Sequence, residues 1–118
     1  MAKYMILIYG DEQRWAAMSQ QEQHELGEGH RAFRAAAGSK VLGGEELEPA
    51  PIATSLRTDS AGRLTITDGP FLETKEALGG YYVLEASDLD DVIALAARLP
   101  EVSAGHSGVE IRPVVDHG

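Results

Sequence analysis

The segment Lys3–Tyr9 (Lys-Tyr-Met-Ile-Leu-Ile-Tyr) constrains the fold of this chain more than any other part of the sequence. Both of its alternating faces are apolar, whereas a strand with one solvated face alternates apolar with polar residues. We therefore predict a central strand that is buried on both faces. In a chain of 118 residues helices can cover one face, and a second subunit is the economical source of cover for the other. The segment thus predicts a homodimer.

Length and composition narrow the class of protein. The length predicts one domain over residues 1–118 with a single modest core. The absence of cysteine excludes disulfides, thiolate chemistry and cysteine-ligated metal centres. A net charge of −9 argues against nucleic acids and anionic membranes as partners, because phosphate binding relies on clustered Lys and Arg. The N-terminus lacks a signal-peptide pattern and no apolar run approaches the roughly 20 residues that span a bilayer, so we expect a cytoplasmic protein.

Periodicity and turn signals predict an alternation of strands and helices. In chain order they predict a strand at 3–9, a helix at 19–37, a strand at 40–47, a hairpin of strands at 52–58 and 63–67, a strand at 80–86, a helix at 88–99 and a strand at 109–115. This order is the ferredoxin-like split βαβ arrangement of an α+β protein, with an inserted β-hairpin.

The ends of the two helices carry their own signals. Ser19-Gln20-Gln21-Glu22 is a capping box for the first helix, and Gly38 should end it. Ser87 is the expected N-cap of the second helix, and Pro100 its stop. Within the first helix, Gly27 and Gly29 each cost on the order of 1 kcal/mol relative to alanine. They either permit close approach of the helix to the sheet or are simply tolerated.

The run from Thr67 to Tyr82 holds the densest group of special residues in the chain. Gly69 is conformationally permissive, and Pro70 fixes its own φ while pushing Gly69 away from the α region. Asp68, just before that turn, can accept local backbone hydrogen bonds or face a cleft. Solvent-filling loops rarely need so much particular chemistry, so we predict that this run contributes to a functional site.

The same run carries a family resemblance. Asp68–Phe71, followed by Glu73–Glu76 and Gly79–Tyr82, resembles the DGPF subgroup of the YCII-related proteins. The opening Lys3–Gly10 and the closing Val109–Pro113 match the same pattern, so the resemblance covers nearly the whole chain. It implies a ferredoxin-like dimeric α+β barrel, in which two sheets pack face to face across a two-fold axis.

The resemblance also implies a site. YCII-like proteins resemble the muconolactone isomerase type of barrel, and one branch includes an enzyme that removes chloride from a chlorinated hydroxyquinol. A histidine–aspartate pair is the proposed active centre of that wider group. By position, His30 matches the histidine, and Asp68 is the candidate acid. Genes of the subgroup are often found beside alternative sigma factors, which suggests regulation.

Both members of this pair have a structural alternative. His30 acts as a general acid or base, or else sits at a helix–sheet contact with its ring hydrogen-bonded to a carbonyl. Asp68 orients the His30 imidazole or acts as a base itself, or else it organises the turn at Gly69-Pro70.

Four further residues are candidates for binding a substrate. Lys75 anchors an anionic group, or else belongs to a solvated short helix. Tyr81 and Tyr82 point to opposite faces of their strand, so that one is expected in the core and the other, Tyr81, at a ligand. Tyr9 and Arg112 lie at the ends of presumed central strands and could line the same cleft.

No cofactor or metal is predicted. His24 and His30 are six residues apart and do not share a helical face for chelation. The chain has no glycine-rich phosphate loop and no nucleophile signature around its serines.

These observations favour a small homodimeric α+β-barrel protein that acts as a cofactor-independent enzyme. His30 and Asp68 would perform proton transfer, in an isomerisation or elimination, on a small oxygenated or anionic organic molecule. The alternative is a non-catalytic ligand-binding or regulatory module linked to sigma-factor transcription control, with the same pocket but no turnover. A third interpretation is a purely structural dimerisation domain.

Overall fold

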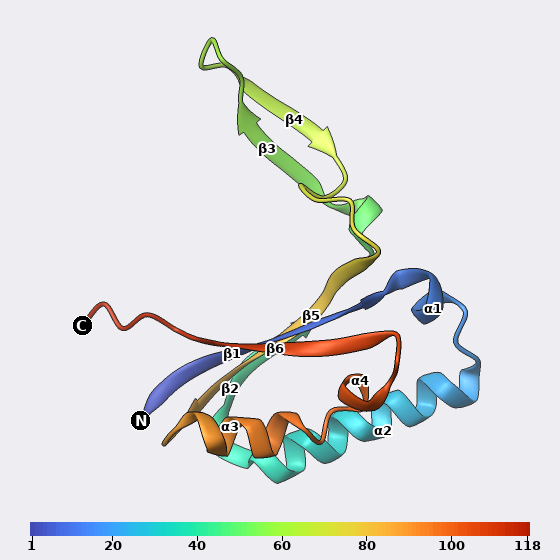
Figure 1. The fold of residues 1–118 in the computed structure, drawn as a ribbon, viewed down its shortest axis with the longest axis vertical. Helices are drawn as coiled ribbons and strands as arrows, with labels where there is room; N and C mark the ends of the chain where they lie inside the picture. Colours follow the sequence, from blue (N-terminus) through green and yellow to red (C-terminus); the bar gives the residue numbers. More distant parts are fainter.

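The computed structural model of the protein describes residues 1–118 and contains a four-stranded antiparallel sheet with the strand order β2-β5-β1-β6 (Figure 1). The strands of this sheet are β1 (Ala2–Asp11), β2 (Val41–Glu46), β5 (Glu76–Ala86) and β6 (Ser107–Pro113). The order is that of a ferredoxin-like sheet, so the predicted α+β fold is confirmed.

Strand β1 lies between β5 and β6, as its apolar pattern predicted. Its even-numbered side chains, from Tyr4 to Ile8, are buried beneath the helices, and its odd-numbered side chains, from Met5 to Tyr9, are half-buried on the other face. All the helices lie on one side of the sheet (Figure 1). We call the uncovered side the open face; its centre is formed by Met5, Leu7, Tyr9, Tyr81 and Val83.

The helices are α1 (Glu12–Ala16), α2 (Gln20–Ala37), α3 (Leu89–Ala96) and α4 (Pro100–Ser103), with 3-10 turns at Gly38–Lys40 and Ala50–Ile52. The capping box of α2 is confirmed. The Ser19 hydroxyl accepts from the N–H of Glu22, and the Glu22 carboxylate accepts from the N–H of Ser19, both at 3.1 Å. Gly38 ends α2 with a φ of 57°, a conformation that favours glycine. None of the helices is long and apolar enough to cross a bilayer.

The second predicted helix differs from the structure. It is shorter, ending at Ala96, and its N-cap is Asp88 rather than Ser87, because the Asp88 carboxylate accepts the N–H of Asp91 at 2.9 Å. Pro100 does not merely stop this helix but begins a further short helix, α4, where a residue without an N–H is well tolerated. The sequence did not predict α4 or α1.

The core lies between the sheet and helices α2 and α3. Its fully buried large side chains are Phe33, Ile6, Leu84, Leu99 and Val92. The ring centroids of Phe33 and Tyr82 lie 4.7 Å apart, so Tyr82 extends the core along β5. The apolar face of α2 is thereby fixed against β5.

The predicted hairpin forms a separate two-stranded sheet of β3 (Thr54–Thr58) and β4 (Leu64–Asp68), which we call the arm. The arm leaves the body where β2 ends and β5 begins, and it stands on the side of the sheet opposite the helices (Figure 1). The short helix expected around Lys75 is absent: the chain bends there, and β5 begins at Glu76. That prediction was wrong because β5 extends its pairing with β1 as far as Glu76, opposite Asp11.

Candidate active site

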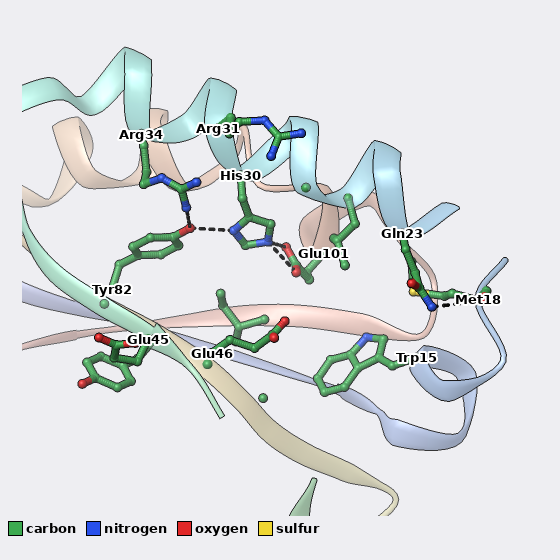
Figure 2. A pocket seen from close by; sticks show the side chains of 17 residues that line it. Trp15, Met18, Gln23, His30, Arg31, Arg34, Glu45, Glu46, Tyr82 and Glu101 are labelled. Atoms are coloured by element: carbon green, nitrogen blue, oxygen red, sulfur yellow. Dashed lines mark hydrogen bonds and ion pairs between the residues drawn. The ribbon is translucent and has the colours of Figure 1, made fainter. Parts of the chain in front are cut away.

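A cavity of about 720 Å³ lies between α2 and the end of the sheet from which the arm leaves (Figure 2). Helix α2 lines it with Gln23, Leu26, Gly27, His30, Arg31 and Arg34. Trp15 and Met18 line it from the segment before α2, and Glu101 from α4. The cavity therefore combines apolar side chains with both signs of charge.

Glycines form the side of the cavity that belongs to the sheet. Gly44 and Gly80 take positions of β2 and β5 that pair with residues on the helix-covered face, so no side chain fills the space there. A Cβ on Gly44 would lie 2.7 Å from the ring of Tyr82, and one on Gly79 would lie 2.5 Å from the ring of Trp15. The register of β2 against β5 shifts between Val41 and Gly43, just before the close contact at Gly44.

His30 is the centre of a hydrogen-bonded chain that crosses the cavity wall (Figure 2). Its Nδ1 lies 2.6 Å from the Tyr82 hydroxyl, and its Nε2 lies 2.8 and 3.0 Å from the two carboxylate oxygens of Glu101. Arg34, one turn further along α2, donates from Nη1 to the same Tyr82 hydroxyl at 3.2 Å. The ring of His30 thus has a carboxylate partner and not the carbonyl of the structural alternative.

The burial of Glu101 and Tyr82 determines which groups carry protons in this series of hydrogen bonds. Glu101 is only 7% exposed, and a buried carboxylate requires a charged or hydrogen-bonding partner, which His30 provides. With Nε2–H donating to Glu101, Nδ1 is left to accept the hydroxyl proton of Tyr82. Burial raises the pKa of Tyr82, the nearby Glu101 charge adds to the rise and Arg34 partly offsets it. The phenol therefore keeps its proton at neutral pH and can pass it along the chain.

A glycine in α2 explains how Glu101 reaches His30. Gly29 packs so closely against Pro100 that an added Cβ would lie 2.9 Å from the proline Cδ and closer still to its Cγ. Pro100 begins α4 and Glu101 follows it, so the contact places a carboxylate beside the residue that follows Gly29 on α2. Gly29 thus serves a close approach of α4, not the approach to the sheet that the sequence suggested.

Trp15 forms the end of the cavity next to α1. Its Nε1 donates to the Ser107 hydroxyl at 2.9 Å, and this oxygen also lies 2.8 Å from Nδ1 of His106. The indole ring occupies a slot between Gly10 and Gly79, where side chains would clash with it. The rigid apolar wall of the cavity therefore depends on two glycines and one hydrogen bond.

The structure does not bring Asp68 to His30. Asp68 ends β4 on the arm, where it is exposed, pairs with Thr54 and does not line the cavity. The adjacent turn at Gly69, with a φ of 103°, is held by the carbonyl of Ala53. Within the chain, the acid beside His30 is Glu101.

The other predicted residues are dispersed. Tyr81 borders the cavity, but its register with Leu7 puts its side chain on the open face. Lys75 is exposed in the bend before β5, outside the cavity lining. Tyr9 and Arg112 lie on the open face, where the Arg112 guanidinium pairs with Glu110 at 2.5 Å.

The sequence reasoning missed Glu101, Tyr82 and Arg34 as members of the site. A signal existed for Arg34, because it lies four residues after His30 and so shares its helical face. The signal for Glu101 was indirect: a glycine in mid-helix marks a close approach, but the sequence does not say which segment approaches.

Fold and site together define a class of small ferredoxin-like α+β domains with a histidine-centred cavity between the first long helix and the sheet. The chain belongs to the YCII-related family, whose domain its sequence matches over residues 2–117. An uncharacterised protein of Rhizobium meliloti (strain 1021) is 33% identical over 116 residues, which covers 94% of this chain and 90% of that protein.

A solved structure shares the fold. It is 5-chloro-2-hydroxyhydroquinone dehydrochlorinase from Burkholderia phenoliruptrix AC1100, in complex with 2,5-dihydroxybenzoquinone. The superposition has a TM-score of 0.54 at 17% sequence identity, and it covers 98% of this chain and 95% of the dehydrochlorinase. At this identity the likeness shows the fold.

Proposed function

We propose that the protein is a cofactor-independent enzyme that transfers a proton on a small organic molecule, with His30 as the group that takes up and returns the proton. One observation carries this proposal. The His30 imidazole lies between a buried carboxylate, at 2.8 Å, and a buried phenol, at 2.6 Å, in the wall of a cavity. Such a chain holds one tautomer of the ring and stabilises its protonated form.

The proposed step runs through Tyr82. The Tyr82 oxygen takes the proton of a substrate C–H or O–H bond while its own proton passes to Nδ1 of His30. The electron pair of the broken bond stays on the substrate. Glu101 stabilises the imidazolium, in the role that the sequence had suggested for Asp68, and Arg34 stabilises the negative charge on the substrate. Return of the proton to another atom completes an isomerisation, and loss of a leaving group completes an elimination.

The cavity lining favours a small ring or short chain that bears an oxygenated or anionic group. Trp15, Met18 and Leu26 supply apolar contact, Arg31 and Arg34 supply positive charge, and Glu45 and Glu46 add negative charge from β2. Arg31 also pairs with Glu28, so Arg34 is the stronger candidate for an anion. The dehydrochlorinase of the same fold, whose structure holds a small oxygenated ring, supports this class of ligand.

We extend the proposal to the assembly and the subgroup. A homodimer would cover the half-buried apolar residues at the centre of the open face, such as Met5 and Leu7. The run Asp68–Phe71 supports membership of the DGPF subgroup. A cytoplasmic location is proposed with it, since a chain without cysteine gains nothing from an oxidising compartment.

The test uses solvent deuterium. Trp15 is the sole tryptophan and lines the cavity, so its fluorescence reports binding from a panel of hydroxylated rings and enolisable acids that begins with 2,5-dihydroxybenzoquinone. Compounds that bind are then followed by proton NMR in deuterium oxide, where a proton-transferring enzyme accelerates the exchange of an acidic C–H bond.

The decisive variant is His30→Gln, and its matched control is His24→Gln on the exposed side of the same helix. We expect His30→Gln to slow exchange by about 100-fold or more while binding persists, and His24→Gln to leave both unchanged. Binding without any exchange in the unmodified protein would instead favour the ligand-binding or regulatory module.

A further inference from the structure

The arm presents an apolar face. Leu56 pairs directly with Ile66, and Leu64 is two positions along the same face, because paired residues and every second residue share a side of the ribbon. These three aliphatic side chains are 53%, 67% and 62% exposed, respectively. The opposite face carries only Ser55, Arg57, Thr65 and Thr67. The arm is therefore amphipathic: one side holds these three aliphatic side chains in solvent, beside Thr54, Thr58 and Asp68, and the other side has no aliphatic residue.

No other part of the chain covers this face. The main packing partner of strand β3 is β4, and neither strand packs extensively against the helices or the four-stranded sheet. An isolated two-stranded hairpin is at best marginally stable in water, and exposed aliphatic surface on it is unfavourable. The arm thus has the amphipathic pattern of a hairpin that is buried on one side. Within its own chain, however, its aliphatic side chains stay exposed.

The place of the arm indicates what buries it. The arm stands on the same side of the sheet as the open face (Figure 1), where Met5, Leu7 and Val83 are only half-buried. A single body packed against the open face would therefore meet the arm as well. Two separate partners are not needed to cover the two apolar surfaces.

The charges of the open face permit a second copy of this chain to pack there. The chain carries a net charge of −9, so two copies repel each other at long range. On the open face itself, however, Lys3 lies in register with Glu85 and Arg112 pairs with Glu110, so four of its charges offset one another, while Glu45 on the same side adds a negative charge. A two-fold axis would also bury both arms in one step, since each copy offers an arm and a body to the other.

We infer that the arm clasps a second copy of the chain, packing its Leu56–Leu64–Ile66 face onto the partner while the two open faces pack together. This inference rests on the homodimer of the proposed function. Glu45 and Tyr81 pair in register with each other on the open-face side and also line the cavity. The clasped copy would therefore lie at the rim of the His30 cavity and help to exclude water from it.

The first test compares two neighbouring substitutions on β4 by sedimentation equilibrium. Ile66→Lys places a charge on the apolar face, and Thr67→Lys places the same charge on the polar face. We expect Ile66→Lys to weaken the dimer by about tenfold or more, as for a residue central to an interface, and Thr67→Lys to leave it unchanged. Far-ultraviolet circular dichroism checks that the body of each variant is folded.

The second test uses the unmodified chain. Amide hydrogen exchange of residues 54–68 should be slow at protein concentrations where the dimer forms and should accelerate on dilution, while exchange in α2 changes little. A dimer that Ile66→Lys and Thr67→Lys affect equally, or arm amides that exchange at one rate at all concentrations, would overturn the clasp. A monomer at every concentration would overturn the homodimer as well, and neither result bears on proton transfer by His30.

Discussion

Gly29 allows a prediction whose sign is opposite to that expected from helix propensity. Replacing a mid-helix glycine by alanine normally stabilises a helix by about 1 kcal/mol. At Gly29, however, the new Cβ would lie within 2.9 Å of the Pro100 ring, which is rigid. Carbon atoms pack best at about 3.5–4.0 Å, so α4 must move by roughly an ångström. Overpacking of this kind costs about 1–3 kcal/mol.

The displacement has a second cost, because Glu101 follows Pro100. Moving α4 weakens the hydrogen bonds between the Glu101 carboxylate and Nε2 of His30, now 2.8 and 3.0 Å long. A hydrogen bond to a charged group contributes about 1.5–3 kcal/mol. The overpacking cost and the hydrogen-bond cost overlap, and the gain in helix propensity offsets part of them. We therefore expect Gly29→Ala to lower the free energy of unfolding by about 1–3 kcal/mol.

The matched control is Gly27→Ala, two residues before Gly29 on α2. Its Cβ would meet only the flexible guanidinium of Arg31, at 3.6 Å, which is an ordinary contact. This variant should therefore gain the full helix term and be stabilised by about 1 kcal/mol. The same substitution at two positions of one helix is thus expected to stabilise the protein at Gly27 and destabilise it at Gly29. The free energies of unfolding of the two variants should differ by about 2–4 kcal/mol.

Urea unfolding followed by circular dichroism, at one fixed protein concentration, measures both values. Glu101→Gln is also introduced into each variant, to test whether Glu101 and Gly29 are coupled. The loss in free energy of unfolding that it causes should be smaller in the Gly29→Ala variant than in the Gly27→Ala variant. If Gly29→Ala is as stabilising as Gly27→Ala, the contact with Pro100 does not constrain α4. The explanation given for the position of Glu101 would then fail.

Three other predictions concern single groups. Because burial raises the pKa of Tyr82, its contribution to stability is complete below pH 10.0 and is lost as the pH rises through the raised pKa, so Tyr82→Phe should flatten the alkaline decline of Tm. The N–H and hydroxyl of Ser19 lower the pKa of Glu22, so this contribution is complete above pH 4.5 and is lost as the pH falls; Glu22→Gln should flatten the acid limb, measured in the same way. Ser107→Ala removes the partner of the Trp15 N–H and should broaden and shift the fluorescence emission of Trp15, whereas Ser103→Ala should not.

The sequence could predict the elements that depend on local patterns. The apolar run Lys3–Tyr9 identified the central strand, and the capping box at Ser19 identified the start of α2, because each signal lies within the element that it specifies. The family resemblance and the order of elements were sufficient for the ferredoxin-like sheet. The hairpin was predicted from its turn, but its position away from the body was not.

The site was harder to predict because its members meet only through tertiary packing. His30 was proposed from the resemblance, yet the residue that contacts its Nε2 lies 71 positions further along the chain, in a helical turn of four residues. The acid after Pro100 looks in the sequence like any solvated first-turn carboxylate. Asp68 was favoured instead because the resemblance implies a histidine–aspartate pair and because its turn has unusual local chemistry; in the structure that turn lies at the connection between the arm and the body.

The glycines beneath the cavity have a consequence for how such a pocket can diversify. Alanine at Gly44 would collide with the backbone oxygen of Tyr81 at 2.6 Å, so the sheet side cannot be rebuilt one methyl group at a time. The opposite wall is different, because Gln23 and Arg31 project from an exposed stretch of α2 and can change without disturbing the core. Related proteins that keep this framework should therefore acquire new ligand preferences through the helix, while the sheet side of the pocket stays the same.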